Sequence, residues 1–317
     1  MLLRGTMSIV AALALIAPAA AGAATRPDVR TGAAASITPT TATLNGRVDP
    51  NNAQTTYFFR YGTTSLFGLT TPAQSAGSGN GFVAVSVPVS GLAPATTYHY
   101  QLVAQNRFGI RRGDRRTFKT KVQPLGVTLA ANPPTVAPGG ATTLVGQLTG
   151  TNNAGRQVAL QSNPFPYLQG FVTTGNAQVT NATGNFSFPV LSVPVTTQFR
   201  VLMPQRPEVV SPVVVVGAAL QVHTRVRKVA RHRHSVGVRF RGSISPDHDG
   251  GRVSIQKLRL GSWAEIAHTS AGGGGTARSR YRTRVRIYRS GQFRVVALSE
   301  GRYVSGAGRT ITIHVRR

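Results

Sequence analysis

An internal repeat constrains the fold of this 317-residue chain more than any other feature of its sequence. Five positions recur at an offset of 96 residues: Leu144, Gly146, Leu148, Gly155 and Arg156 correspond to Phe240, Gly242, Ile244, Gly251 and Arg252. The tetrapeptide Gln-Phe-Arg-Val at 198–201 recurs at 292–295, an offset of 94, so a two-residue deletion separates the copies. A period of this length predicts two related copies of one complete β-sandwich.

Strands are predicted along the whole chain. Apolar and polar residues alternate in short runs rich in Val, Thr, Phe and Tyr, and 35 Gly and 19 Pro supply frequent turns. No long helical period is present, which favours an all-β chain of antiparallel sandwiches over parallel α/β units. Because the chain is too long for one ordinary sandwich, we expect three tandem antiparallel β-sandwich domains, at 25–121, 122–217 and 218–317.

The N-terminus has the pattern of an export signal. Arg4 precedes an apolar run at 7–17, and an A-x-A site follows at 21–23. The run is shorter than the roughly 20 residues that cross a bilayer, so residues 1–24 are predicted to be a cleaved signal peptide. The chain has no cysteine, which excludes disulfides and thiolate chemistry. We expect a secreted protein, extracellular or in the cell envelope.

The first predicted sandwich carries a family resemblance. It lies in three segments: 41–51 (TATLNGRVDPN), 55–64 (TTYFFRYGTT) and 92–106 (LAPATTYHYQLVAQN). These resemble a bacterial fibronectin type III domain, although the tryptophan of many such domains is absent. The resemblance implies that Tyr98, in the pattern L-x-P-x-T-x-Y, is a structural tyrosine corner whose hydroxyl bonds to backbone.

The third predicted sandwich carries a second resemblance. Its segments at 253–256 (VSIQ), 262–263 (SW) and 281–295 resemble immunoglobulin-like stalk modules of exported actinobacterial-type proteins. That resemblance implies an immunoglobulin-like fold and a non-enzymatic stalk or adhesion role at the cell surface. It implies no particular ligand and no cofactor.

Charge is concentrated in the last third of the chain. The whole sequence has 36 Lys+Arg against 8 Asp+Glu, a net charge of +28. From residue 219 onward, 19 Arg and 2 Lys face 4 acids, which leaves +17 in 99 residues and +11 in the other 218. A surplus of this size attracts polyanions.

Arginines alternate with apolar residues in three predicted strands of the third sandwich, so they point outward together. In an immunoglobulin-like order two of these strands are neighbours. The predicted anion-binding face comprises Arg225, Arg227, Arg239, Arg241, Arg280, Arg282, Arg284 and Arg286. The matching outward positions of the second sandwich are uncharged: Thr143, Val145, Gln147 and Ser187.

Several polyanions fit such a face. Guanidinium groups suit phosphate in particular, so an exported chain could hold an anionic cell-wall polymer, an acidic glycan or lipid headgroups. Two alternatives stay open: nonspecific DNA binding, and an accessory role beside a carbohydrate-active enzyme. For DNA, the face lacks aromatic residues that stack on bases and the chain lacks a recognition helix, so only contacts to phosphate are expected. The face is also compatible with a solvated surface that reflects arginine-rich composition.

The remaining motifs favour structural roles. Arg112-Gly113-Asp114 is an RGD tripeptide, predicted in the loop between the last two strands of the first sandwich, but its arginine neighbours disfavour a cation-centred adhesion site. Asp247 and Asp249 resemble part of a calcium-binding loop, yet the equivalent turn of the second sandwich has no carboxylate. A hand-type loop that starts at Asp247 would also need a glutamate at its twelfth position, which is Leu258.

Neither metal binding nor catalysis has clear support. His232 and His234 are a candidate imidazole pair, but the arginines beside them oppose a cation, and we predict a solvated basic turn. Among the eight acids only Asp247 and Asp249 lie close in sequence, and no nucleophile or phosphate-loop motif is present. The chain is therefore predicted not to be an enzyme.

Overall fold

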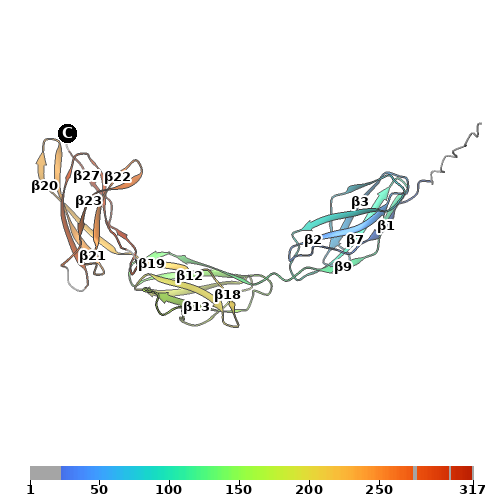
Figure 1. Cartoon of the computed structure of the whole chain (residues 1–317), viewed down its shortest axis with the longest axis horizontal. Helices are drawn as coiled ribbons and strands as arrows, with labels where there is room; N and C mark the ends of the chain where they lie inside the picture. Colours follow the sequence, from blue (N-terminus) through green and yellow to red (C-terminus); the bar gives the residue numbers. More distant parts are fainter. Residues whose placement is uncertain (1–22, 274–276, 300, 316–317) are drawn as a thin grey trace, which may run out of the picture. The chain divides into compact units, whose positions relative to one another are not determined.

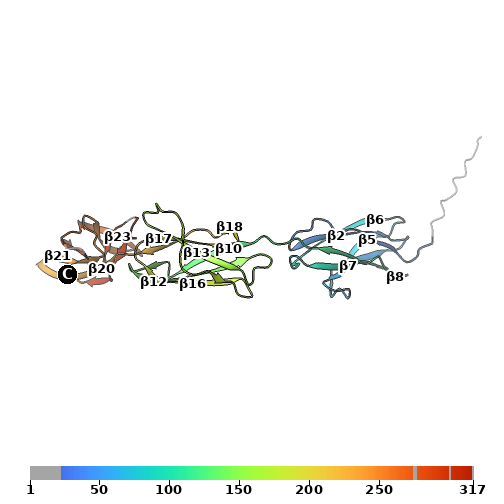
Figure 2. The same ribbon diagram turned by 90° about the horizontal axis from the view of Figure 1, so that it is seen from below.

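The structure is a computed structural model that describes residues 23–273, 277–299 and 301–315. The predicted signal peptide at 1–24 therefore lies, except for its last two residues, outside the described residues. All regular elements of the described ranges are strands (Figures 1 and 2), and none of these residues belongs to a helix long and apolar enough to cross a bilayer. The chain divides into two compact units, Met1–Gln123 and Pro124–Arg317.

The first unit is a two-sheet sandwich. One sheet has the order β1-β2-β6, and the other has β4-β3-β7-β8 with β5 on β3 and β9 on β7. The bounds are β1 Asp28–Thr31, β2 Thr41–Asp49, β3 Thr55–Gly62, β4 Leu69–Thr70, β5 Gln74–Gly77, β6 Val83–Ser90, β7 Thr97–Asn106, β8 Gly109–Arg112 and β9 Arg116–Lys119. Leu44 from one sheet and Phe59 and Leu102 from the other are fully buried in the core.

Tyr98, at the start of β7, lies buried at the edge of this core. Its hydroxyl accepts a hydrogen bond from the amide of Ala93 at 2.9 Å, and its ring stacks on Phe118. The hydroxyl thus binds the chain five residues upstream, which is the geometry of a tyrosine corner.

The RGD tripeptide lies at the edge of the larger sheet of the first unit, where β8 ends. The hairpin turn after β7 falls at Arg107 and Phe108, whereas Arg112 pairs with Val103 inside β8. Strands β8 and β9 both pair with β7, so they are successive parts of one edge strand and the tripeptide is an irregularity between them. The Gly113 amide donates to the carbonyl of Leu102 at 2.9 Å. Gly113 and Asp114 thus lie between the last two strands of the first unit, β8 and β9, and the side chains of Arg112 and Asp114 are exposed, but the Gly113 backbone bond holds the segment against β7.

The second unit contains two further sandwiches. The first of them pairs the sheet β10-β12-β16 with a larger sheet ordered β11-β19-β17-β13-β14, to which β15 and β18 add at β13 and β17. The bounds are β10 Gly126–Asn132, β11 Thr135–Val136, β12 Gly140–Thr149, β13 Gln157–Pro164, β14 Val172–Thr173, β15 Gln178–Val179, β16 Asn185–Val193, β17 Thr197–Met203, β18 Arg206–Val210 and β19 Val214–Ala218. Only β11 and β19 pair in parallel among these strands.

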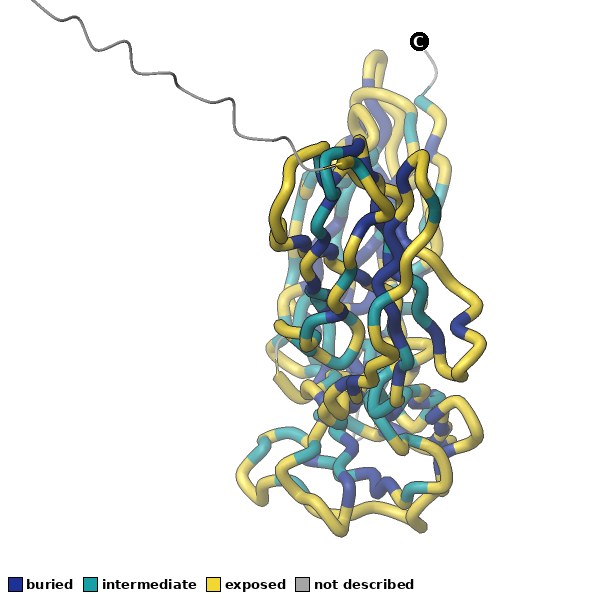
Figure 3. The backbone as a smooth tube through the Cα atoms, turned by 90° about the vertical axis from the view of Figure 1, so that its right-hand side faces the viewer, coloured by how far each residue is buried: buried dark blue, intermediate teal, exposed yellow. Residues whose placement is uncertain are grey.

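The other sandwich of this unit repeats the plan with all strand pairs antiparallel. Its sheets are β20-β21-β24 and β23-β22-β25-β26, with β27 on β25. The bounds are β20 Gln221–His232, β21 Ser235–Ser245, β22 Arg252–Arg259, β23 Ser262–Ser270, β24 Ser279–Ile287, β25 Gly291–Ala297, β26 Gly306–Ala307 and β27 Ile311–Ile313. Most of the buried core residues lie on strands (Figure 3), and the all-β sandwich fold predicted from the sequence is confirmed.

The repeat extends to individual side-chain contacts. Arg200 donates through Nε to Gln161 at 2.8 Å and covers the ring of Phe171. At the equivalent place Arg294 donates to Gln256 at 2.9 Å and covers Trp263. The arginine of each Gln-Phe-Arg-Val tetrapeptide is therefore held by an amide and an aromatic ring, and has a structural role in both copies.

The two sandwiches of the second unit share backbone hydrogen bonds at their junction. The Val304 amide donates to Ala218 at 2.9 Å, and the Leu220 amide donates to Val304 at 3.1 Å. The amide of Thr196, in the earlier sandwich, donates to the carbonyl of Arg302 in the later one at 2.9 Å. These bonds leave no free linker between the two copies.

Candidate anion-binding face

The three-stranded sheet of the last sandwich has one buried and one charged side. Along β21 the side chains of Val238, Phe240 and Ile244 are fully buried, and Tyr281 and Ile287 of β24 join them in the core. Because successive side chains of a strand point to opposite faces, Arg239 and Arg241 of β21 and Arg282 and Arg284 of β24 face solvent. β21 lies between β20 and β24 in this sheet.

The strand register aligns the outward arginines in two rows that cross all three strands. One row is Arg225, Arg241 and Arg282, and the other is Arg227, Arg239 and Arg284. Neighbours lie about 4.8 Å apart across the strands and about 6.6 Å apart along them, measured between backbones. Arg280 lies opposite Ser243 and Arg286 opposite Gly237, so the structure brings all eight predicted residues onto one surface, hereafter the arginine face.

No described carboxylate lies within ion-pair distance of the arginine face. The ion pairs of the described residues, Arg111–Asp28, Arg252–Glu265 and His268–Glu265, all lie elsewhere. Arg239, at the centre, is half-buried. Its partial burial, and then the charges of Arg282, Arg284, Arg227 and Arg241, lower the pKa of its guanidinium. A cation held among cations is stabilised by any anion that binds beside it.

A groove of about 1480 Å³ continues the arginine face around the edge of β20. Six arginines line it, and no carboxylate does among its described residues: Arg225, Arg241, Arg278, Arg280, Arg282 and Arg309. Arg278 and Arg309 were not predicted as site residues. Arg278 continues the alternation of β24 by two residues and was detectable from the sequence, whereas Arg309 reaches the groove only through the tertiary fold.

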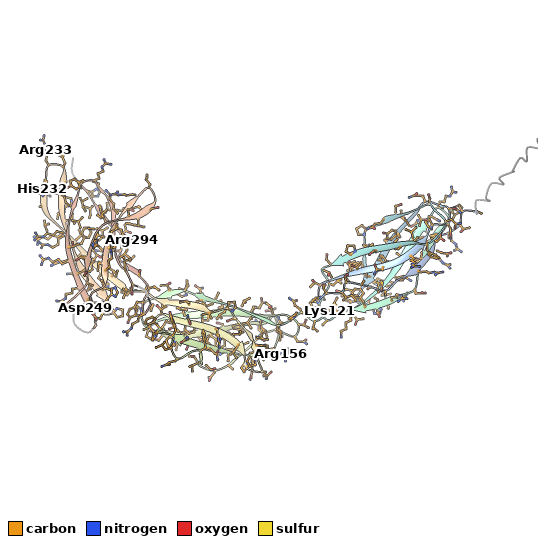
Figure 4. All side chains as sticks on the ribbon, in the orientation of Figure 1. Lys121, Arg156, His232, Arg233, Asp249 and Arg294 are labelled. Carbon is orange, nitrogen blue, oxygen red and sulfur yellow. The ribbon has the colours of Figure 1, made fainter. Side chains whose placement is uncertain are left out.

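The other candidate residues have structural surroundings. Figure 4 places His232 and Arg233 at one end of the sandwich and Asp249 at the other. His232 Nε2 lies 3.2 Å from Nη2 of Arg286, an arginine rather than a metal ligand. The carboxylates of Asp247 and Asp249 both lie within hydrogen-bonding distance of the buried hydroxyl of Ser279, and the described residues contain no cluster of three metal-ligating side chains.

Tyr281 of β24 lies on the buried side of the sheet that carries the arginine face. Its hydroxyl lies 2.6 Å from the hydroxyl of Thr224 and donates to the carbonyl of His223 at 3.2 Å. Burial raises its pKa from 10.0 to about 12, and the bond to Thr224 opposes this only in part. The neutral phenol is therefore favoured in the folded chain.

The raised pKa of Tyr281 predicts a loss of stability in alkali. A raised folded pKa contributes stability that is complete below pH 10 and disappears as the pH rises to about 12. Two pKa units correspond to roughly 2.7 kcal/mol in the free energy of unfolding. The measurement is denaturant unfolding followed by the fluorescence of Trp263, the single tryptophan, which lies in this sandwich. Tyr281→Phe should flatten the dependence; an equal fall in that variant would contradict it.

The second sandwich provides an internal comparison for the arginine face. Its corresponding sheet pairs Ala130 with Val145 and Val145 with Ser187, where the last sandwich has Arg225, Arg241 and Arg282. The same fold therefore forms without these charges. Of the two copies of the repeat, the last sandwich carries the arginine face and the second sandwich does not.

Comparisons with known proteins give no family for this chain. No protein-family model and no curated protein matches it. Among solved structures, domains A168–A170 of titin are 14% identical with a TM-score of 0.34, over 93% of this chain and all of that one. The FN1–FN3 domains of chicken CNTN1 are 12% identical with a TM-score of 0.29, again over 93% and 100% of the two chains.

A third match is the sensor domain of the anti-sigma factor RsgI4 of Pseudobacteroides cellulosolvens. It is 20% identical with a TM-score of 0.26, and covers 30% of this chain and 94% of that one. All of these TM-scores lie below 0.5, so the fold assignment depends on the strand order described above.

Proposed function

We propose that this chain is an exported, envelope-associated stalk or adhesion protein without enzymatic activity, whose last sandwich binds an anionic envelope polymer. The observation that carries the proposal is the arginine face: eight arginines on one sheet surface, with no described carboxylate within ion-pair distance. Like charges at this density destabilise a sheet unless anions cover it. The second sandwich then serves as the spacer between that attachment and the fibronectin-like unit.

Salt dependence tests this function directly. The full chain should be retained on immobilised anionic polymer at low ionic strength and released as salt rises, because binding of a polyanion to arginine releases counterions. A neutral glycan matrix serves as the control and should retain nothing. Salt-insensitive retention on the neutral glycan would instead support the accessory role beside a carbohydrate-active enzyme.

Fractionation of the native cells tests the location. The chain should sediment with the envelope and leave it in a rising salt wash. Recovery in the culture supernatant at low salt would contradict envelope attachment. Equal retention on double-stranded DNA and on the envelope polymer would favour the nonspecific nucleic-acid alternative.

A further inference from the structure

A separate hollow of about 340 Å³ opens within the arginine face. Three arginines and four small or apolar residues line it: Arg239, Arg284, Arg286, Val229, Ala230, Gly237 and Val285. The hollow lies beside the two arginine rows, at the end of the face nearer the turn between β20 and β21.

Two local features produce this hollow. The pairing of β20 with β21 shifts register between Lys228 and Ala230, a β-bulge that moves the edge strand. Opposite the bulge, Gly237 has no side chain; a Cβ added there would lie 3.1 Å from the Cβ of Ala230. A larger side chain at 237 would occupy the space that the bulge leaves.

One arginine that lines the hollow has an unpaired donor. Nε of Arg239 is buried and has no hydrogen-bond partner among the described residues, although buried polar groups are almost always paired. Nη2 of Arg286 lies 3.2 Å from Nε2 of His232, and this contact restricts the position of the Arg286 guanidinium group. Burial and four neighbouring arginines also lower the pKa of Arg239, so an anion bound beside it stabilises its charged form.

We propose that the hollow is a subsite for a tetrahedral phosphate group, so that the arginine face prefers phosphate-bearing polyanions over carboxylate-bearing ones. Arg284 and Arg286 approach from β24 and Arg239 from β21. Three guanidinium groups from two strands match oxygens that point in several directions, whereas a carboxylate offers two oxygens in one plane. The inference rests on the proposed function, because it names the ligand class of the same face.

A matched pair of variants tests the subsite in the full chain. Arg286→Gln and Arg280→Gln each remove one charge from β24, but only Arg286 lines the hollow. Affinities for long-chain polyphosphate and for polygalacturonate are measured at one ionic strength. Arg286→Gln should lower the ratio of the two affinities about tenfold, the effect of one charge-assisted hydrogen bond, while Arg280→Gln should weaken both polymers alike.

Filling the hollow provides a second test without a change of charge. Gly237→Val should reduce the polyphosphate preference as Arg286→Gln does, and Thr312→Val, on an exposed position of β27, should not. If Trp263 fluorescence shows that the Gly237→Val chain is unfolded, the smaller substitution Gly237→Ala replaces it in the same measurement. Phosphatidylglycerol vesicles distinguish a lipid headgroup from a free polymer as the phosphate source; preferential binding to either supports the inference.

The outcomes separate the two proposals. If the unmodified chain binds neither polymer, the proposed function fails. If it binds both but Arg286→Gln and Arg280→Gln change the ratio equally, or Gly237→Val retains the original ratio, the arginine face stands and the phosphate subsite is overturned.

Discussion

Gly242→Ala should destabilise the last sandwich by about 3 kcal/mol or more, a large part of the stability of a typical domain. Gly242 faces the core between Phe240 and Ile244, and the ring of Tyr281 occupies the place of its missing side chain. A Cβ at 242 would collide with the carbonyl of His223 and lie 2.6 Å from the Tyr281 hydroxyl. One contact is backbone and the other is hydrogen-bonded, so neither can move away cheaply.

Denaturant unfolding followed by Trp263 fluorescence measures this effect in the sandwich concerned. Gly272→Ala is the matched control, because a Cβ at 272 meets nothing within 4 Å. The repeat contains the same arrangement at Gly146, where a Cβ would collide with the carbonyl of Thr128. A Gly242→Ala chain as stable as the Gly272→Ala chain would show that this packing is wrong.

Neutralising both arginine rows should remove most of the salt dependence of polyanion binding. Each phosphate neutralised contributes about 0.7 to 0.9 to the slope of log affinity against log salt. We consider a chain with glutamine at all six row positions: Arg225, Arg227, Arg239, Arg241, Arg282 and Arg284. The magnitude of its slope should be smaller than that of the original chain by roughly 4 to 5. Because like charges repel, the same chain should unfold at a higher temperature than the original.

A control with equal charge makes this experiment specific. Six exposed arginines of the first unit provide it: Arg47, Arg107, Arg111, Arg112, Arg115 and Arg116. Replacing these six by glutamine changes the net charge identically and should leave most of the slope in place. Equal losses in the two chains would mean that total charge, rather than the arginine face, governs binding.

The repeat allowed much of the last sandwich to be predicted. Aligning Gly146 with Gly242 located the same strand in both copies, and the alternation from Arg280 to Arg286 assigned an outward side to β24. Alternation is a local property, because successive side chains of any strand point to opposite faces. The class of fold was therefore predictable from the sequence.

The first unit shows where local patterns were insufficient. The sequence around Arg112-Gly113-Asp114 has the composition of a loop, yet the segment is bound to β7 by backbone hydrogen bonds. Composition does not reveal whether a glycine lies at a hairpin or within an edge strand, because that depends on which neighbour supplies the backbone partners.

By itself the sequence determined the strands, the repeat and the side of each strand that carries charge, since all three follow from residue order. Only the tertiary structure decided how the charges group: cross-strand register aligned Arg225 with Arg241 and Arg282 and brought Arg309 to the groove. The hollow at Gly237 likewise required a β-bulge in the partner strand. Register and bulges depend on contacts between distant segments, and these contacts converted an excess of arginine into a shaped surface.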